Sequence, residues 1–157
     1  MLEFEHLIEI NDPQRPDIPA LSRNDLWQGL VYRAKYPGHF NPALQSSLQE
    51  ETGSSFTRFI TAGEMVMRDE VTLCEPNEIR TLIDGRTQSM HAESITRIEE
   101  PEPGHLFVRF IYRRDAIELG GGIDANEFLK TAYLQGDREA VAILRQMIAD
   151  GWSETTM

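Results

Sequence analysis

Cysteine, paired histidines and long apolar runs are scarce in this sequence. Cysteine occurs once, at Cys74, so the chain cannot form an internal disulfide, which fits a reducing compartment. The four histidines are spread singly, without the paired spacing of a zinc or iron motif. No apolar run approaches the roughly 18 residues that a membrane-spanning helix needs. We therefore predict no metal site and no membrane insertion.

Basic residues are also few. The chain has 15 Lys and Arg against 26 Asp and Glu, and its net charge is −11. Such a charge opposes binding to nucleic acid or to an anionic membrane surface. The segment 1–10 carries three glutamates where a secretory signal would need a basic start and an apolar stretch. We predict a cytoplasmic protein whose partner is a small molecule and not nucleic acid, and we leave a homodimer open.

Motifs that bind nucleotide cofactors are missing as well. A triple glycine at 120–122 precedes an expected helix, but the sequence has neither a full G-x-G-x-x-G pattern nor a Walker lysine. We therefore predict no cofactor. The sequence also has no internal repeat and no low-complexity linker, and its length suits one core. One domain is expected over residues 1–157.

The C-terminal segment predicts one long amphipathic helix. Asp124 is a good N-cap, and Glu127 three residues later completes a capping box. The helix is expected to run to about Asp150, with Asp137 on its polar side and Gly136 marking a bend, a close backbone approach or a cavity mouth. The apolar stripe consists of Leu129, Ala132, Tyr133, Gly136, Ala140, Ile143, Leu144 and Met147.

The rest of the chain is dominated by strand patterns of period two. The segment 2–10 alternates apolar and acidic residues, and a helix capped by Ser22 follows it. Five or six antiparallel strands separated by turn signals are expected between Leu48 and about Arg114. This order predicts an α+β, helix-grip fold. In it, a curved antiparallel sheet of six to seven strands wraps around the long C-terminal helix, with short helices after strand one.

Several short stretches of the sequence match a known pattern, namely 4–13 (FEHLIEINDP), 26–30 (LWQGL), 33–34 (RA), 69–71 (DEV), 132–133 (AY), Asp137 and 143–145 (ILR). In these residues the sequence resembles the AtaL-like branch of the START-like superfamily, which is also called SRPBCC. The resemblance covers nearly the whole chain and implies a helix-grip fold with an apolar cavity between sheet and helix. Because this branch is known mainly as a domain of unknown function, the resemblance supplies architecture and little chemistry.

A few polar side chains are expected on the apolar side of the sheet. His6 and Tyr112 lie on the apolar parity of the first and last strands, and Asp69 lies on that of a middle strand. Arg58 has an ambiguous facing and could pair with Asp69. Each has a structural alternative. His6 can be a hydrogen-bonded core histidine, Asp69 can lie at a β-bulge or pair with an arginine such as Arg58, and Tyr112 can be a phenol hydrogen-bonded to the sheet. The ligand-binding interpretation places all four in one cavity.

Four further residues would close this cavity from the helical side under the expected fold. They are Trp27, Phe40, Leu129 and Tyr133. Plain core packing explains each of them equally well, so the sequence alone does not separate ligand contact from core.

Two classes of function fit these residues. We favour a non-catalytic binder of a hydrophobic, lipid-like or polyketide-like small molecule, in which one or two polar groups orient the ligand. The alternative is a polyketide cyclase, aromatase or lyase that uses His6, Asp69, Arg58 and Tyr112 as acids and bases, although no catalytic residue is assigned. If the four polar groups converge in one pocket, the enzyme is favoured. If each group has its own separate hydrogen-bond or ion-pair partner, the binder is favoured.

Overall fold

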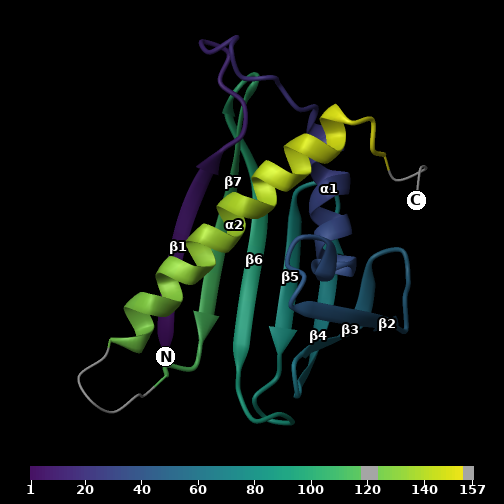
Figure 1. The fold of residues 1–157 in the computed structure, drawn as a ribbon, viewed down its shortest axis with the longest axis vertical. Coiled ribbons are helices and arrows are strands. Elements are labelled where there is room, and N and C mark those ends of the chain that lie inside the picture. Colours follow the sequence, from purple (N-terminus) through teal and green to yellow (C-terminus); the bar gives the residue numbers. More distant parts are fainter. Residues whose placement is uncertain (118–123, 154–157) are drawn as a thin grey trace.

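The computed structural model describes residues 1–117 and 124–153, and within them a sheet carries two α-helices and one short 3-10 helix (Figure 1). The strands follow one another as hairpins from β2 to β7, and β1 pairs with β7. The elements are β1 (Leu2–Glu9), α1 (Arg23–Lys35), η1 (Pro37–His39), β2 (Leu44–Gln49), β3 (Ser55–Ala62), β4 (Met65–Cys74), β5 (Glu78–Ile83), β6 (Ala92–Glu102), β7 (His105–Arg114) and α2 (Ala125–Ala149).

The sheet has the order β1-β7-β6-β5-β4-β3-β2, and every neighbouring pair is antiparallel. The predicted α+β fold with six to seven strands is confirmed. In β1, β4 and β7 the more buried positions largely alternate with less buried ones, as the sequence predicts. The β2 edge lies crosswise to β6 and β7, so the sheet is strongly bent (Figure 1).

α1 begins where its sequence signal places it. The Ser22 side chain accepts a hydrogen bond from the Asp25 backbone N–H at 3.0 Å, which satisfies one free donor of the first turn. α1 buries one face against the rest of the core, and Gly29 on that face lies directly against Leu144 of α2. A side chain at this position would meet the Leu144 side chain, so the two helices approach closely there.

α2 is one helix that crosses the sheet diagonally toward α1 (Figure 1). Its N-cap, Asp124, accepts from the Glu127 N–H at 3.1 Å, as predicted. Near its other end, Arg145 donates to the carbonyl oxygens of Pro19 and Ile10 and so ties the helix to the chain that leaves β1. None of the described helices is long and apolar enough to cross a membrane.

One expectation for α2 is wrong, and one alternative at Gly136 is excluded. A Cβ built at Gly136 would have no neighbour within 4 Å, so of the three alternatives given for it the close backbone approach is excluded. Asp137 was expected on the polar side of the helix but is 1% exposed and faces the sheet residues His6 and Tyr112. The buried face contains Ala140 and Leu144 of the expected stripe, and it adds Asp137 and Val141, which the stripe did not include.

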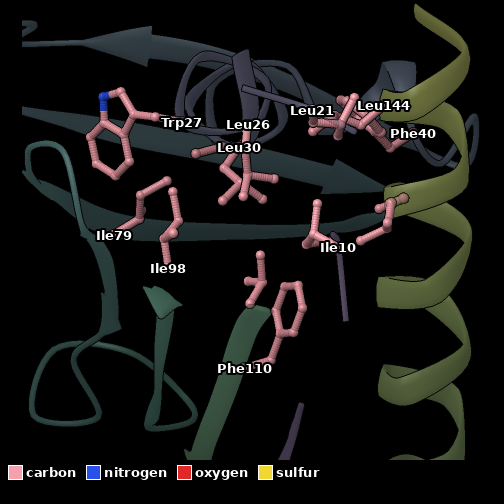
Figure 2. Packing of buried hydrophobic residues seen from close by; sticks show 14 of the residues in the cluster. Ile10, Leu21, Leu26, Trp27, Leu30, Phe40, Ile79, Ile98, Phe110 and Leu144 are labelled. Atoms are coloured by element: carbon pink, nitrogen blue, oxygen red, sulfur yellow. The ribbon is translucent and has the colours of Figure 1, made fainter. Parts of the chain in front are cut away.

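The apolar core lies where α1, α2 and the sheet meet (Figure 2). Its most buried members come from every layer and include Ile10, Leu26, Phe56, Val71, Val108, Phe110 and Leu144. Because α2 crosses obliquely and α1 covers one end, part of the inner face of the sheet remains uncovered by core side chains, and a cavity lies there.

Candidate ligand-binding cavity

A cavity of about 550 Å³ lies between the inner face of the sheet and the helices. This volume is within the roughly 300–1,000 Å³ that small-molecule sites occupy. Its walls come from β2 to β7, α1, the start of η1 and Tyr133 of α2. Most wall residues are apolar, among them Leu30, Ile60, Met67, Ile79, Ile83 and Met90.

One end of the cavity wall is backed by a buried carboxylate, Asp137. Its Oδ2 accepts hydrogen bonds from His6 Nε2 at 2.7 Å and from the Tyr112 hydroxyl at 2.5 Å. Its Oδ1 forms an ion pair with Arg33 Nη1 at 2.9 Å. A carboxylate that is 1% exposed is costly unless paired, and here three donors from three different elements stabilise it. We name Asp137, His6, Tyr112 and Arg33 the Asp137 cluster.

The environment of Tyr112 keeps its phenol neutral. Burial raises the pKa of Tyr112 well above its usual 10, and the nearby negative charge of Asp137 raises it further. The hydroxyl therefore stays protonated and donates to Asp137. Tyr112 and Arg33 also line the cavity, so two members of the Asp137 cluster face the space that a ligand would fill.

A second polar group on the wall is the Arg58–Asp69 ion pair. Arg58 donates from Nε and Nη2 to the two carboxylate oxygens of Asp69, at 2.9 and 2.6 Å. Its Nη1 donates to the carbonyl of Ala34 in α1 at 2.7 Å. Asp69 is 5% exposed, and this bidentate geometry satisfies its charge. The ambiguous facing of Arg58 is thereby resolved, because both side chains point inward and line the cavity.

A third polar group joins the end of β7 to α2. Arg114 donates from Nη1 to the Tyr133 hydroxyl at 3.1 Å, and Tyr133 stacks near Tyr112 with ring centroids 4.3 Å apart. The guanidinium also contacts the sulfur of Met90 at 3.9 Å and the backbone oxygen of Asp115 at 3.2 Å. Arg114, Tyr133 and Met90 all line the cavity.

The residues predicted for the site fall into two groups. Arg58, Asp69, Tyr112 and Tyr133 line the cavity, whereas His6 lies behind Tyr112 and is bonded to Asp137. Ligand contact by any of them remains a prediction.

The other three predicted residues do not line this cavity. Trp27 lines a separate hollow of about 170 Å³ between α1 and Trp152. Phe40 is buried in the apolar core, and Leu129 is half-buried in the first half of α2.

Sequence patterns did not assign three charged residues, Arg33, Asp137 and Arg114, to the cavity or its buried wall. Arg33 is three residues after Leu30 on α1, and Asp137 is four residues after Tyr133 on α2, so both had the helical spacing of an inward face. Arg114 shares the parity of Tyr112 at the end of β7. Their polar character hid this signal, because charged residues at such spacing are usually assigned to the solvent side.

One cluster in the described residues has the composition of a metal site. Glu9, Asp12 and His105 bring one potential ligand atom each to within 4.8 Å of one another. They lie outside the cavity, and His105 Nε2 is already 2.8 Å from Glu9. Sequence spacing could not reveal this group, because His105 is 96 residues from Glu9 along the chain.

The sequence matches the family model AtaL, described as acetylaranotin biosynthesis cluster protein L, over residues 8–151. A comparison with curated proteins gives no match. The family match therefore covers most of the chain without naming an activity.

Solved structures share this fold at low sequence identity. The di-domain ARO/CYC protein BexL of the BE-7585A biosynthetic pathway is 14% identical, with a TM-score of 0.65, covering 92% of this chain and 49% of BexL. This chain thus spans about half the length of that structure. The Zhui aromatase/cyclase from a Streptomyces species is 14% identical, with a TM-score of 0.58, covering 97% of this chain and 99% of Zhui.

A START superfamily protein from Mycobacterium smegmatis is similar as well. It is 11% identical, with a TM-score of 0.60, covering 93% of this chain and 97% of its own. At such identities the likeness establishes the fold alone, which is the START-like helix-grip arrangement.

Proposed function

The chain belongs to the AtaL family, and we propose that this member binds an apolar small molecule in the cavity between its sheet and helices. The observation that carries the proposal is the cavity itself. It combines a volume suited to a small molecule with mostly apolar walls and a few fixed polar groups, which is the usual composition of a small-molecule site. The ligand we infer is lipid-like or polyketide-like.

The arrangement of the polar groups favours a binder over an enzyme. Arg58 and Asp69 neutralise each other, while His6 and Tyr112 both donate to Asp137. Among the described residues, no buried polar side-chain atom lacks a hydrogen-bond partner. The four groups are therefore satisfied as two separate sets, which suits a stable wall around a ligand better than an acid and a base poised to exchange protons.

One observation supports a second candidate, a polyketide cyclase-like or aromatase-like activity. Arg33 and Tyr112 both face the cavity and both contact Asp137, so a substrate carbonyl that displaced one of these contacts would meet a cation and a neutral phenol. Such donors can stabilise a developing oxyanion. The similar folds of BexL and Zhui, named ARO/CYC and aromatase/cyclase, are compatible with this candidate.

The proposed binding function is tested by a substitution on the sheet that fills part of the cavity with a larger side chain. Ala92 lines the cavity on β6, and Ile95 on the same strand does not. We expect Ala92→Phe to weaken binding of the fluorescent polyene cis-parinaric acid by roughly tenfold or more, since the new ring occupies ligand volume. Ile95→Phe adds the same ring elsewhere and should bind like wild type. Equal binding by wild type and Ala92→Phe would refute the proposed site.

Two further measurements separate binder from enzyme. Native mass spectrometry of the freshly purified protein should reveal a co-purifying lipid-like mass, and Ala92→Phe should carry less of it. Incubation with a poly-β-ketone substrate, followed by absorbance of the aromatic product, tests the second candidate. Acceleration by wild type that Tyr112→Phe reduces by roughly a hundredfold would favour the enzyme, and no acceleration by either protein favours the binder.

A further inference from the structure

The three arginines of the cavity wall differ in what neutralises them. Arg33 is paired with the carboxylate of Asp137, and Arg58 is paired bidentately with Asp69. Arg114 has no carboxylate within 4.0 Å among residues 1–117 and 124–153. Its described partners are a hydroxyl, a thioether and a backbone carbonyl, all of them neutral.

In the described part of the chain, the remaining acid of the wall forms no ion pair with Arg114. Glu93 lines the cavity, and the contact recorded for its carboxylate is with His91 Nε2 at 3.3 Å. Among residues 1–117 and 124–153, Arg114 is therefore the one wall arginine without a carboxylate contact, although Glu93 is also on the wall and the chain as a whole has a net charge of −11. A cation with only neutral contacts in a mostly apolar hollow attracts an anion, and a guanidinium matches the planar, two-oxygen geometry of a carboxylate.

A ligand that lies in the apolar part of the cavity can bring an anionic group into contact with Arg114. Ile83, Met90 and Ile117 line the same cavity as Arg114, and Tyr133 offers a phenol that already contacts the guanidinium. A molecule with its apolar body along these side chains would present its polar end to Arg114 and Tyr133. The weak sulfur contact at 3.9 Å is the bond that an incoming oxygen would most easily replace.

We propose that the cavity is selective for amphipathic carboxylic acids, whose carboxylate is bound by Arg114 and Tyr133 while the apolar body fills the cavity. This inference rests on the proposed function, since it requires a ligand in that space. It specifies the chemical class of the ligand's polar end, a carboxylate, and names Arg114 as the residue that recognises it. The body of the ligand can be an aliphatic chain or a polycyclic aromatic system, because both have the same carboxylate chemistry.

The test compares each acid with its own methyl ester, which has almost the same body but no charge. Cis-parinaric acid represents the aliphatic class and anthracene carboxylic acid the polycyclic class, and each is titrated by fluorescence near neutral pH at low salt. We expect wild type to bind at least one acid roughly tenfold or more tightly than its ester, because a charge-assisted hydrogen bond is lost in the ester. The acid that shows this preference tells whether the apolar body of the ligand is aliphatic or polycyclic.

Arg114→Gln and Arg113→Gln form a matched pair, because both remove one positive charge from neighbouring positions of β7. Arg113 is exposed and paired with Glu3, away from the cavity. Arg113→Gln should keep the preference for acid over ester, and Arg114→Gln should lose it while still binding the ester. Tyr133→Phe, a milder change, should reduce the preference without abolishing it, and it substitutes for Arg114→Gln if that variant fails to fold.

The outcomes separate this inference from the function on which it rests. Equal binding of acid and ester by wild type, or an acid preference that survives in Arg114→Gln, overturns the inference and leaves the hydrophobic binder standing. Failure of both acids and both esters to bind overturns the two together. A preference lost equally in Arg113→Gln would mean that only the overall charge matters, which also overturns the role of Arg114.

Discussion

His6 and Asp137 are 131 residues apart in the sequence, and His6 Nε2 lies 2.7 Å from the carboxylate of Asp137. This contact joins the first strand to the last helix. The same carboxylate also binds Tyr112 of β7 and Arg33 of α1. The elements β1, β7, α1 and α2 are therefore linked through one buried carboxylate. The Asp137 cluster therefore sets the position of α2 over the sheet, and with it the shape of the cavity end that Tyr112 and Arg33 line.

Removing the charge of Asp137 should destabilise the fold strongly. In Asp137→Asn the ion pair with Arg33 is lost, and the amide group places a donor where His6 or Tyr112 also donates. We expect a loss of about 3–5 kcal/mol in the free energy of unfolding, measured by urea denaturation. Glu139→Gln on the exposed face of α2 should change it by less than about 0.5 kcal/mol. Similar losses in both variants would contradict the role of Asp137.

The strands of this fold could be predicted from the sequence more securely than the helical faces. In β1, β4 and β7 the alternation of apolar residues sets which side chains face inward, and it correctly placed Tyr112 and Asp69 on the inner side. A strand has only two faces, so a polar residue on the apolar parity is easily recognised. The caps at Ser22 and Asp124 were equally local and equally predictable.

Asp137 could not be assigned in the same way. A helical face has a width that depends on its partner, and a charged residue at the margin of an apolar stripe is normally counted as exposed. Asp137 is buried only because His6, Tyr112 and Arg33 meet it, and these contacts come from distant parts of the chain. Long-range pairing of this kind leaves no pattern in a single sequence.

The buried phenol of Tyr112 should make stability depend on alkaline pH. Its pKa is raised in the folded protein, while in the unfolded chain it is near the usual value of about 10. The stabilisation is therefore fully present below about pH 10 and is lost as pH rises from there through the folded-state pKa, at about 1.4 kcal/mol per pH unit.

This pH dependence can be isolated by comparing tyrosine variants. The difference in unfolding free energy between wild type and Tyr112→Phe should be constant near pH 8 and should shrink above about pH 10. Tyr36 is 42% exposed, so Tyr36→Phe should give a difference from wild type that does not change with pH in this way. A Tyr112→Phe difference that stays constant to high pH would mean that the phenol ionises freely in the folded state.

The Arg58–Asp69 pair should behave as a unit in a double-mutant cycle. Asp69→Leu leaves a largely buried guanidinium without its carboxylate, and Arg58→Met leaves the reverse, so each should cost about 3–5 kcal/mol. The double variant should cost far less than the sum, because no buried charge is left over. Arg80→Met breaks an exposed pair with Glu78 and should cost less than about 1 kcal/mol. Additive costs for Arg58 and Asp69 would show that they do not stabilise each other.

Two glycine-to-alanine changes, one in each helix, should have opposite effects on stability. At Gly29 of α1 the new methyl would lie 2.7 Å from Leu144 Cγ, so the helices must separate or Leu144 must change rotamer, at about 1–3 kcal/mol. At Gly136 of α2 the methyl meets nothing within 4 Å, and alanine should stabilise the helix by up to about 1 kcal/mol through its higher propensity. Thermal and urea unfolding of the two variants beside wild type measures both effects. Stabilisation by Gly29→Ala would mean that α1 and α2 are not closely packed, and destabilisation by Gly136→Ala would mean that the open space beside it is needed.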